Sequence, residues 1–158
     1  MNLLLDTNVV IDYLGRKEPF FPAAQKIIAA GYFRDATLYA PVQSLKDAYF
    51  VLSHHIDQVR VQRAIVKLAE VVTFVAPTGD DAVRAARLEW PDYEDCLVAL
   101  CAEKARADYL LTRDVKGFDR SPVPVMTPED WLQMMHDAQS IEYHEVGLGE
   151  PAASTEDR

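Results

Sequence analysis

The sequence predicts an α/β fold in which short parallel strands form one sheet that helices cover on both faces. Two observations lead to this prediction. Short apolar runs of strand length alternate with longer segments of helical pattern, and no internal repeat or linker divides the chain. The length of 158 residues fits one domain. With 49% hydrophobic and 26% charged residues, the composition is that of a soluble globular protein rather than a disordered chain.

The first half of the chain contains three expected strands. Residues 2–5 (NLLL) are uniformly apolar and lead directly into Asp6-Thr7-Asn8, a typical helix start, so we expect a buried strand there. The helix that follows covers residues 9–14 and ends at Gly15, and a second helix is expected to end at Gly31. The other expected elements of this half are helices at 22–30, 44–55, 58–70 and 80–88 and strands at 37–42 and 71–75.

The second half contains the longest expected helix. Pro91 breaks the chain, and Asp92 then caps a helix over residues 92–107 that has acidic residues in its first turn. Strands at 109–112 and 123–126 and a helix at 128–137 complete the elements. We therefore expect one domain over residues 1–137. An acidic, flexible tail is expected over residues 138–158, because the segment from Ser140 has few large apolar residues.

The sequence predicts a cytoplasmic protein. No apolar run approaches the ~18–20 residues that span a bilayer, and the amino terminus reaches Asp6 without the basic region of a signal peptide. Cys96 and Cys101 lie in one expected helix, about 7.5 Å apart along its axis, which disfavours a disulfide. Their spacing is not that of a zinc site either, so we expect two free, buried cysteines.

The net charge of −9 argues against a broad basic patch that would attract a polyanion. The segment from Ser140 onward carries −4 of this charge, which leaves −5 for the rest of the chain. If four carboxylates of the body bind cations, the remaining surface is close to neutral. The acidity therefore does not exclude a nucleic-acid substrate.

The candidate functional residues are carboxylates. The sequence has no P-loop, no dinucleotide-binding glycine motif, no nucleophile elbow and no recognisable triad around its four histidines. Asp6 and Asp114 follow two expected strands, and ligands of open α/β sheets bind at the carboxyl ends of strands. Asp95 lies in the first turn of a helix. Asp47 lies in the helix at 44–55, which is apolar around most of its circumference, so we expect that helix to be largely buried and Asp47 to need a partner.

Each carboxylate also has an ordinary structural interpretation. Asp6 caps a helix, Asp95 complements a helix dipole, Asp114 is a turn residue, and Asp47 pairs with a lysine or arginine. Four carboxylates gathered at one site, however, repel one another unless cations hold them apart. Mg²⁺ and Mn²⁺ prefer oxygen ligands and activate water for phosphodiester hydrolysis. The joint placement of the four carboxylates therefore favours a metal centre.

The sequence resembles the PIN-domain nucleases, and most closely the VapC-type toxins of toxin–antitoxin pairs. The motifs that carry the resemblance are LLLDTNVVIDYL, SLKDAYFVL, PDYEDCLVALCAEKARADYLLTRD and SPVPVMTPEDWL, which together span about residues 2–135. The resemblance implies a three-layer α/β/α fold with a five-stranded, mainly parallel sheet. It also implies metal ligands at Asp6, Asp95 and Asp114, with Asn8 and Thr112 supporting them. The second acid of the family, in chain order, is most often Glu, whereas this chain has Asp47 there.

These observations lead to the hypothesis of an Mg²⁺- or Mn²⁺-dependent endoribonuclease that cleaves single-stranded RNA. The toxin role, a cognate antitoxin and a homodimer are implied by the resemblance alone. Basic residues beside the acids either contact the RNA or are solvated surface charges: Arg113, Lys116 and Lys46.

Two other functions share features with this sequence. A haloacid-dehalogenase-type phosphatase needs a second Asp two residues after Asp6, and position 8 is Asn. A catalytically silent PIN-like module that binds RNA or a partner stays open because of the substitution at Asp47. A metal-dependent cleavage assay would discriminate the nuclease from the silent module.

Overall fold

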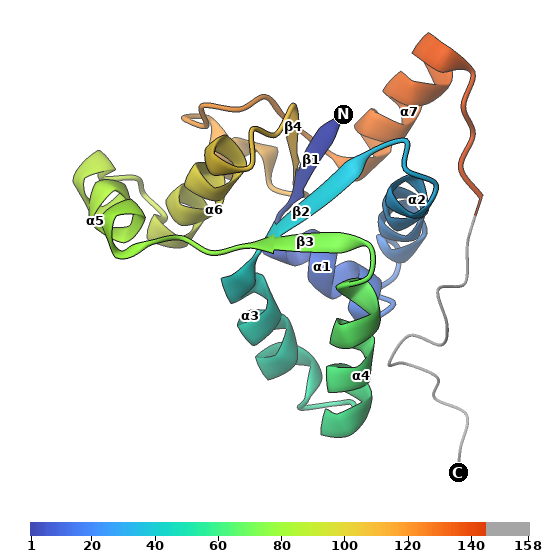
Figure 1. Ribbon diagram of the computed structural model, residues 1–158, viewed down its shortest axis with the longest axis horizontal. Coiled ribbons are helices and arrows are strands. Elements are labelled where there is room, and N and C mark those ends of the chain that lie inside the picture. The colour runs from blue at the N-terminus through green and yellow to red at the C-terminus, as the bar shows by residue number, and fades with distance from the viewer. Residues whose placement is uncertain (145–158) are drawn as a thin grey trace.

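The structure, a computed structural model, describes residues 1–144 and contains one five-stranded sheet (Figure 1). All neighbouring strands are parallel, in the order β3-β2-β1-β4-β5. This arrangement confirms the predicted α/β class. The strands are β1 (Asn2–Leu5), β2 (Thr37–Pro41), β3 (Val72–Val75), β4 (Tyr109–Leu111) and β5 (Val125–Met126).

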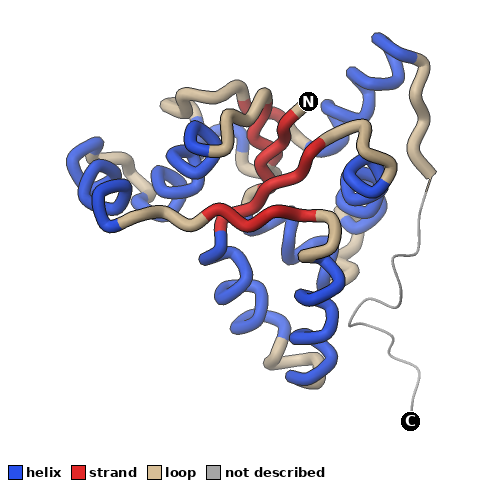
Figure 2. The backbone as a smooth tube through the Cα atoms, viewed as in Figure 1, coloured by secondary structure: helices blue, strands red, loops and turns tan. Residues whose placement is uncertain are grey.

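Helices cover both faces of this sheet, which gives the expected three layers (Figure 2). Helix α6 packs on one face against β1, β2 and β4, with α5 outside it, and the remaining helices gather around α1 and α2 on the other face. The helices are α1 (Thr7–Leu14), α2 (Phe21–Tyr32), α3 (Val42–Leu52), α4 (Gln58–Leu68), α5 (Gly79–Leu88), α6 (Tyr93–Lys104) and α7 (Pro128–Gln139), and a 3₁₀ helix, η1, covers Val115–Phe118.

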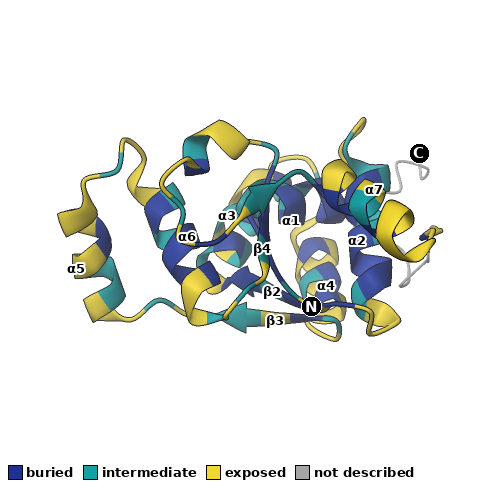
Figure 3. Cartoon of the chain, turned by 90° about the horizontal axis from the view of Figure 1, so that it is seen from above, coloured by how far each residue is buried: buried dark blue, intermediate teal, exposed yellow. Residues whose placement is uncertain are grey.

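The central strand β1 is apolar on both sides because both of its faces are covered. Leu3 and Leu5 are fully buried in the core that contains α1, α2 and Trp131 of α7. Leu4, which points the opposite way, packs in a second core with Val98 of α6. Buried residues therefore lie on both sides of the sheet, and Figure 3 shows them along the strands and on the helices that cover it.

Gly31 does not end helix α2, which was expected to stop before it. The helix continues to Tyr32, and a Cβ at Gly31 would lie 2.5 Å from Cδ1 of Leu38 and 2.9 Å from Cγ1 of Val71. The glycine therefore allows α2 to approach β2 and the residue before β3 closely, and it does not act as a helix stop.

Helix α3 differs from the sequence prediction in position and in burial. It begins at Val42 and ends at Leu52, so residues 53–55 lie outside it. We expected this helix to be largely buried, which is wrong: Phe50 is 66% exposed and Val51 is 45% exposed. Only the side of α3 that faces α1 is buried, through residues such as Ser44 and Ala48.

Two further boundaries have clear physical causes. Helix α6 ends at Lys104 instead of residue 107, because Arg106 takes a left-handed conformation (φ 50°) and the amide of Ala107 donates to the carbonyl of Ala102 at 3.0 Å. Strand β5 is shorter than the expected 123–126, since Pro124 has no amide N–H for a strand ladder.

The expected domain boundary after residue 137 falls inside α7, which continues to Gln139. Beyond the helix, Tyr143 is buried (5% exposed) and stacks on Trp131 with ring centroids 5.9 Å apart. Ile141 also packs against this core. Ile141 and Tyr143 therefore pack on the domain, although they fall within the flexible tail expected over residues 138–158. The part of that tail after residue 144 lies outside the described residues.

Candidate functional site

The candidate site lies where the strand order changes direction, at the carboxyl ends of β1 and β4. The chain leaves β1 toward β2 and β3 and later returns to the other side of β1 as β4. Ligands of open α/β sheets bind at such a switch point. Asp6 directly follows β1, and Asp114 lies three residues after the end of β4.

Asp6 is a buried carboxylate held by three hydrogen bonds. The backbone amide of Thr7 donates to Oδ1 at 2.7 Å. The Thr112 hydroxyl and the Asn8 side-chain amide each donate to Oδ2 at 2.8 Å. Burial raises the pKa of Asp6, and these hydrogen bonds oppose that shift. The carboxylate is therefore fixed in orientation, and its burial makes the ionised form energetically unfavourable.

Asn8 and Thr112 connect the ends of the two strands. The Asn8 amide also donates to the Thr112 hydroxyl at 3.0 Å, and its carbonyl oxygen accepts from the backbone amide of Arg113 at 3.3 Å. The backbone amide of Asp114 donates to the Thr112 hydroxyl at 3.0 Å. These contacts fix the position of the segment after β4 relative to Asp6.

Asp95 enters the same region from the amino terminus of α6. Asp92 caps that helix, as expected, by accepting from the amides of Glu94 and Asp95. Burial, followed by the negative charges of Asp92, Asp6 and Asp114, raises the pKa of the Asp95 carboxyl to about 6. Asp6, Asp95 and Asp114 are therefore near enough to repel one another.

Gly117 leaves space for two of these carboxylates. A Cβ at this position would lie 2.7 Å from Oδ2 of Asp114 and 2.9 Å from Oδ2 of Asp95. Its backbone amide donates to Oδ1 of Asp114 at 3.1 Å. Any side chain at Gly117 would therefore displace the oxygens of Asp95 and Asp114.

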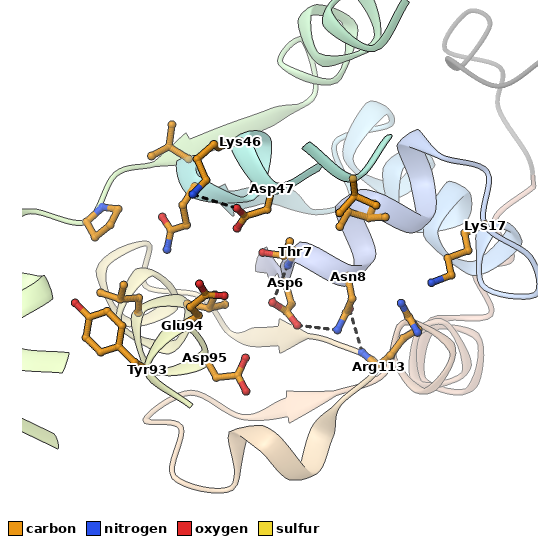
Figure 4. A pocket seen from close by; sticks show the side chains of 17 residues that line it. Asp6, Thr7, Asn8, Lys17, Lys46, Asp47, Tyr93, Glu94, Asp95 and Arg113 are labelled. Atoms are coloured by element: carbon orange, nitrogen blue, oxygen red, sulfur yellow. Dashed lines mark hydrogen bonds and ion pairs between the residues drawn. The ribbon is translucent and has the colours of Figure 1, made fainter. Parts of the chain in front are cut away.

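Asp47 lies on α3 and lines the same cavity as Asp6 and Asp95 (Figure 4). It pairs with the adjacent Lys46, whose Nζ lies 3.4 Å from Oδ1 of Asp47. Both side chains are partly or largely exposed, so the ion pair is screened by solvent and weak. Asp47 therefore faces the cavity with a neighbouring cation as its partner.

The cavity has a volume of about 770 Å³ and carries charges of both signs. Its acidic lining residues are Asp6, Asp47, Glu94 and Asp95, and its basic ones are Lys17, Lys46 and Arg113. Of the three cations expected to contact RNA, Lys46 and Arg113 line the cavity, whereas Lys116 is exposed and does not.

Sequence reasoning missed Lys17 and Asp12 in this region. Lys17 lies in the loop after α1, where no pattern distinguishes it. Asp12 is buried in the apolar segment TNVVIDYL. A carboxylate in a mostly apolar helix is expected to be buried and to need a partner. The same expectation therefore applies to Asp12 as to Asp47.

Comparison with known proteins identifies the family. Residues 2–116 match the model of the PIN domain, which covers most of the chain. The chain belongs to the PIN-domain family. No curated protein sequence matches it.

Solved structures share the fold of this PIN domain. VapBC2 from Rickettsia felis, bound to a DNA fragment of its promoter, has a TM-score of 0.61 at 15% identity, over 80% of this chain and 98% of that one. VapBC-1 from nontypeable Haemophilus influenzae has a TM-score of 0.61 at 22% identity, over 82% and 99%. PAE2754 from Pyrobaculum aerophilum has the same TM-score at 17% identity, over 87% and 90%.

PIN domains are generally nucleases that depend on divalent metal ions. Within residues 1–144, no three Asp, Glu, His or Cys side chains form a ready-made metal cage. The donors nevertheless fit Mg²⁺ or Mn²⁺, because they are carboxylate oxygens and because Mg²⁺ keeps several waters and needs only one or two carboxylates. The space at Gly117 leaves the oxygens of Asp95 and Asp114 free to approach a cation.

Two other expectations concern the rest of the PIN domain. Cys96 and Cys101 are both free and buried, as the sequence predicted. In the part of the chain that the structure describes, no helix is long and apolar enough to cross a membrane.

Proposed function

We propose that this PIN domain is a divalent-metal-dependent endoribonuclease that hydrolyses single-stranded RNA. The observation that carries the proposal is the convergence of Asp6, Asp95 and Asp114 at the switch point of the sheet, where Gly117 adjoins oxygens of both Asp95 and Asp114. Burial and the charges of neighbouring acids, Asp6 and Asp114 among them, raise the pKa of Asp95. Such a group is destabilised unless a cation binds. Asp47 lines the same cavity and is the proposed fourth ligand.

In this proposal, each residue of the site has a defined task. Asp6, Asp95 and Asp114 hold Mg²⁺ or Mn²⁺, and the hydrogen bonds from Asn8 and Thr112 keep Asp6 in one orientation. A bound cation supplies an activated water and stabilises negative charge on the phosphate. No side chain is needed as a covalent nucleophile. Lys46 and Arg113 are placed to contact the RNA backbone, and Lys116 would do so only outside the cavity.

The test is cleavage of an unstructured RNA oligonucleotide with Mn²⁺, with Mg²⁺ and with EDTA. Asp6→Asn should abolish cleavage, because it replaces the most constrained carboxylate of the site. Asp119→Asn, which neutralises an exposed carboxylate beyond η1, is the matched control and should leave the rate unchanged. If the chain binds RNA without cleaving it under any of these conditions, it is a catalytically silent module.

We further propose that the chain is the toxin of a toxin–antitoxin pair, is cytoplasmic and forms a homodimer. Support comes from its fold, which is shared with VapBC complexes and with FitAB bound to a DNA fragment (TM-score 0.58, 16% identity). A neighbouring gene for a small DNA-binding protein would supply the antitoxin. Co-expression of the two should give a stable complex and suppress RNA cleavage, and light scattering of the chain alone would report the dimer.

A further inference from the structure

A second group of charges lies beside the acidic cavity and takes no part in the proposed metal centre. Its centre is Asp12 of α1, which is 1% exposed. Oδ2 of Asp12 lies 2.7 Å from Nε of Arg113, and Oδ1 has no hydrogen-bond partner. A buried carboxylate is costly without a counter-charge, so this position requires Arg113.

The Arg113 side chain is held on two sides. In addition to the contact with Asp12, its guanidinium carbon lies 4.2 Å from the ring centroid of Phe20. Its backbone amide donates to Asn8, so the main chain at this residue is also fixed. An arginine fixed by a buried acid and an aromatic ring loses little conformational entropy when it binds a ligand.

Arg113 also borders the acidic cavity. Its side chain is 28% exposed and lines the cavity together with Lys17 (Figure 4). The 2.7 Å contact with Asp12 is made by Nε, and no hydrogen bond among residues 1–144 uses either Nη atom. Lys17 and Arg113 lie at the same end of the cavity, away from Lys46 (Figure 4). The other cavity cation, Lys46, is paired with Asp47.

A backbone phosphate is the ligand that this arrangement fits. The paired Nη groups of an arginine match two phosphate oxygens, and a nearby lysine adds a point charge. The acidic centre itself repels a polyanion, so an RNA strand needs cations at the edge of the cavity.

We infer that Arg113, positioned by Asp12 and Phe20 and assisted by Lys17, binds a phosphate of the RNA strand next to the one at the acidic centre. Asp12 is then a positioning residue. The inference rests on the proposed function for its substrate class, and it assigns roles to Asp12, Phe20 and Lys17 within that function. The alternative is a purely structural ion pair that fastens α1 to the segment after β4.

Asp12→Asn distinguishes a positioning role of Asp12 from a purely structural ion pair, because the two predict opposite changes in RNA affinity. The substitution keeps the size of the side chain and removes one negative charge near the RNA. If Asp12 has no positioning role, lower repulsion should strengthen RNA binding. If Asp12 positions Arg113, binding should weaken although the net charge becomes more favourable.

The experiment measures binding of a fluorescently labelled single-stranded RNA by anisotropy, in EDTA and over a range of salt concentrations. Arg113→Ala should weaken binding about tenfold, as expected for one charge-assisted contact. It should also lower the slope of log K against log salt by about 0.7. Lys17→Ala should lower the slope similarly. Arg63→Ala, which removes an exposed arginine of α4 outside the cavity, is the matched control and should change neither quantity by as much.

Arg113→Lys gives a second measurement that leaves Asp12 with a counter-charge. It should keep most of the salt slope and lose most of the affinity, because lysine lacks the planar fork. Circular dichroism and the thermal midpoint identify variants that do not fold. If Asp12→Asn fails to fold, Arg113→Lys decides: affinity equal to that of the unaltered chain would overturn the inference.

Failure of the inference and failure of the proposed function give different results. If RNA is cleaved but Arg113→Ala binds as tightly as Arg63→Ala, the inference is wrong and the nuclease proposal stands. If Arg113→Ala weakens binding but no metal supports cleavage, the inference stands for a silent RNA-binding module. If the chain cleaves RNA and Arg113 binds a neighbouring phosphate, Arg113→Ala should raise KM more than it lowers kcat. The reason is that this phosphate is bound equally in the ground and transition states.

Discussion

Thr112 and Asp6 are 106 positions apart in the chain, and the Thr112 hydroxyl donates to Oδ2 of Asp6 at 2.8 Å. The same hydroxyl accepts from the amide of Asp114 at 3.0 Å. One side chain therefore orients one acidic residue and fixes the backbone of another. This is possible because β1 and β4 are neighbours in the sheet, with Leu5 in register with Leu111.

Thr112→Val tests this relationship, because it keeps the shape of the side chain and removes its hydroxyl. Asp6 loses one donor and Asp114 loses its acceptor. We expect a loss of stability of about 1–3 kcal/mol and a larger loss of metal-dependent cleavage. Thermal melts and cleavage rates measure the two effects. Thr73→Val, on the exposed side of β3, is the control and should change neither.

Asp95→Asn should change how stability depends on pH in the absence of metal. The pKa of Asp95 is raised from 3.8 to about 6 in the folded chain, first by burial and then by neighbouring acids. The folded state therefore binds more protons than the unfolded state between about pH 4 and 6, and stability falls as pH rises through this window.

The measurement is the thermal midpoint in EDTA at pH 5 and at pH 7. The unaltered chain should lose more stability between these values than Asp95→Asn, by a midpoint difference of about 2–4 °C. Asp119→Asn should behave like the unaltered chain. Identical pH dependence in Asp95→Asn would show that burial and the neighbouring acids do not raise the pKa of Asp95.

Gly117→Ala should disturb the site without unfolding the domain. Its Cβ would meet the carboxylate oxygens of Asp114 and Asp95, which must shift. We expect the stabilisation by Mn²⁺, seen as a rise of the thermal midpoint, to fall strongly while the metal-free midpoint changes little. Gly79→Ala is the control, because nothing lies within 4 Å of a Cβ there. An unchanged response to Mn²⁺ in Gly117→Ala would place the metal elsewhere.

Asp47 is tested by two substitutions. If Asp47 is a ligand, Asp47→Asn should weaken Mn²⁺ binding and cleavage, and Asp47→Glu should be tolerated because relatives are expected to have Glu there. If cleavage persists in Asp47→Asn, the metal centre consists of Asp6, Asp95 and Asp114 alone. The ion pair with Lys46 is exposed, so neither substitution should lower stability by more than about 1 kcal/mol.

Tyr143→Ala tests whether the segment after α7 contributes to the fold. Tyr143 is buried against Trp131, so removing its ring should cost about 2–4 kcal/mol and lower the thermal midpoint by several degrees. Tyr143→Phe keeps the ring and should cost much less. Equal midpoints for Tyr143→Ala and the unaltered chain would favour the flexible tail that the sequence predicts over residues 138–158.

The sequence by itself determined the class of fold and the order of its elements. The run NLLL had to be buried on both faces, and such strands alternating with helices require a parallel sheet. Local patterns also placed the cap at Asp92 and the helix end at Gly15, because capping depends on neighbours within a few residues. The four candidate acids were visible for the same reason: each lies at a strand end or in a helix.

Only the tertiary structure decided what surrounds those residues. Gly31 has the local pattern of a helix end, but its role is set by contacts with Leu38 and Val71. The exposure of Phe50 depends on which side of α3 faces α1, and the docking of Tyr143 depends on Trp131. The pairing of Asp12 with Arg113 joins positions 101 residues apart. No short segment contains both members of such contacts, so periodicity and capping cannot predict them, and the packing of separate elements fixes them.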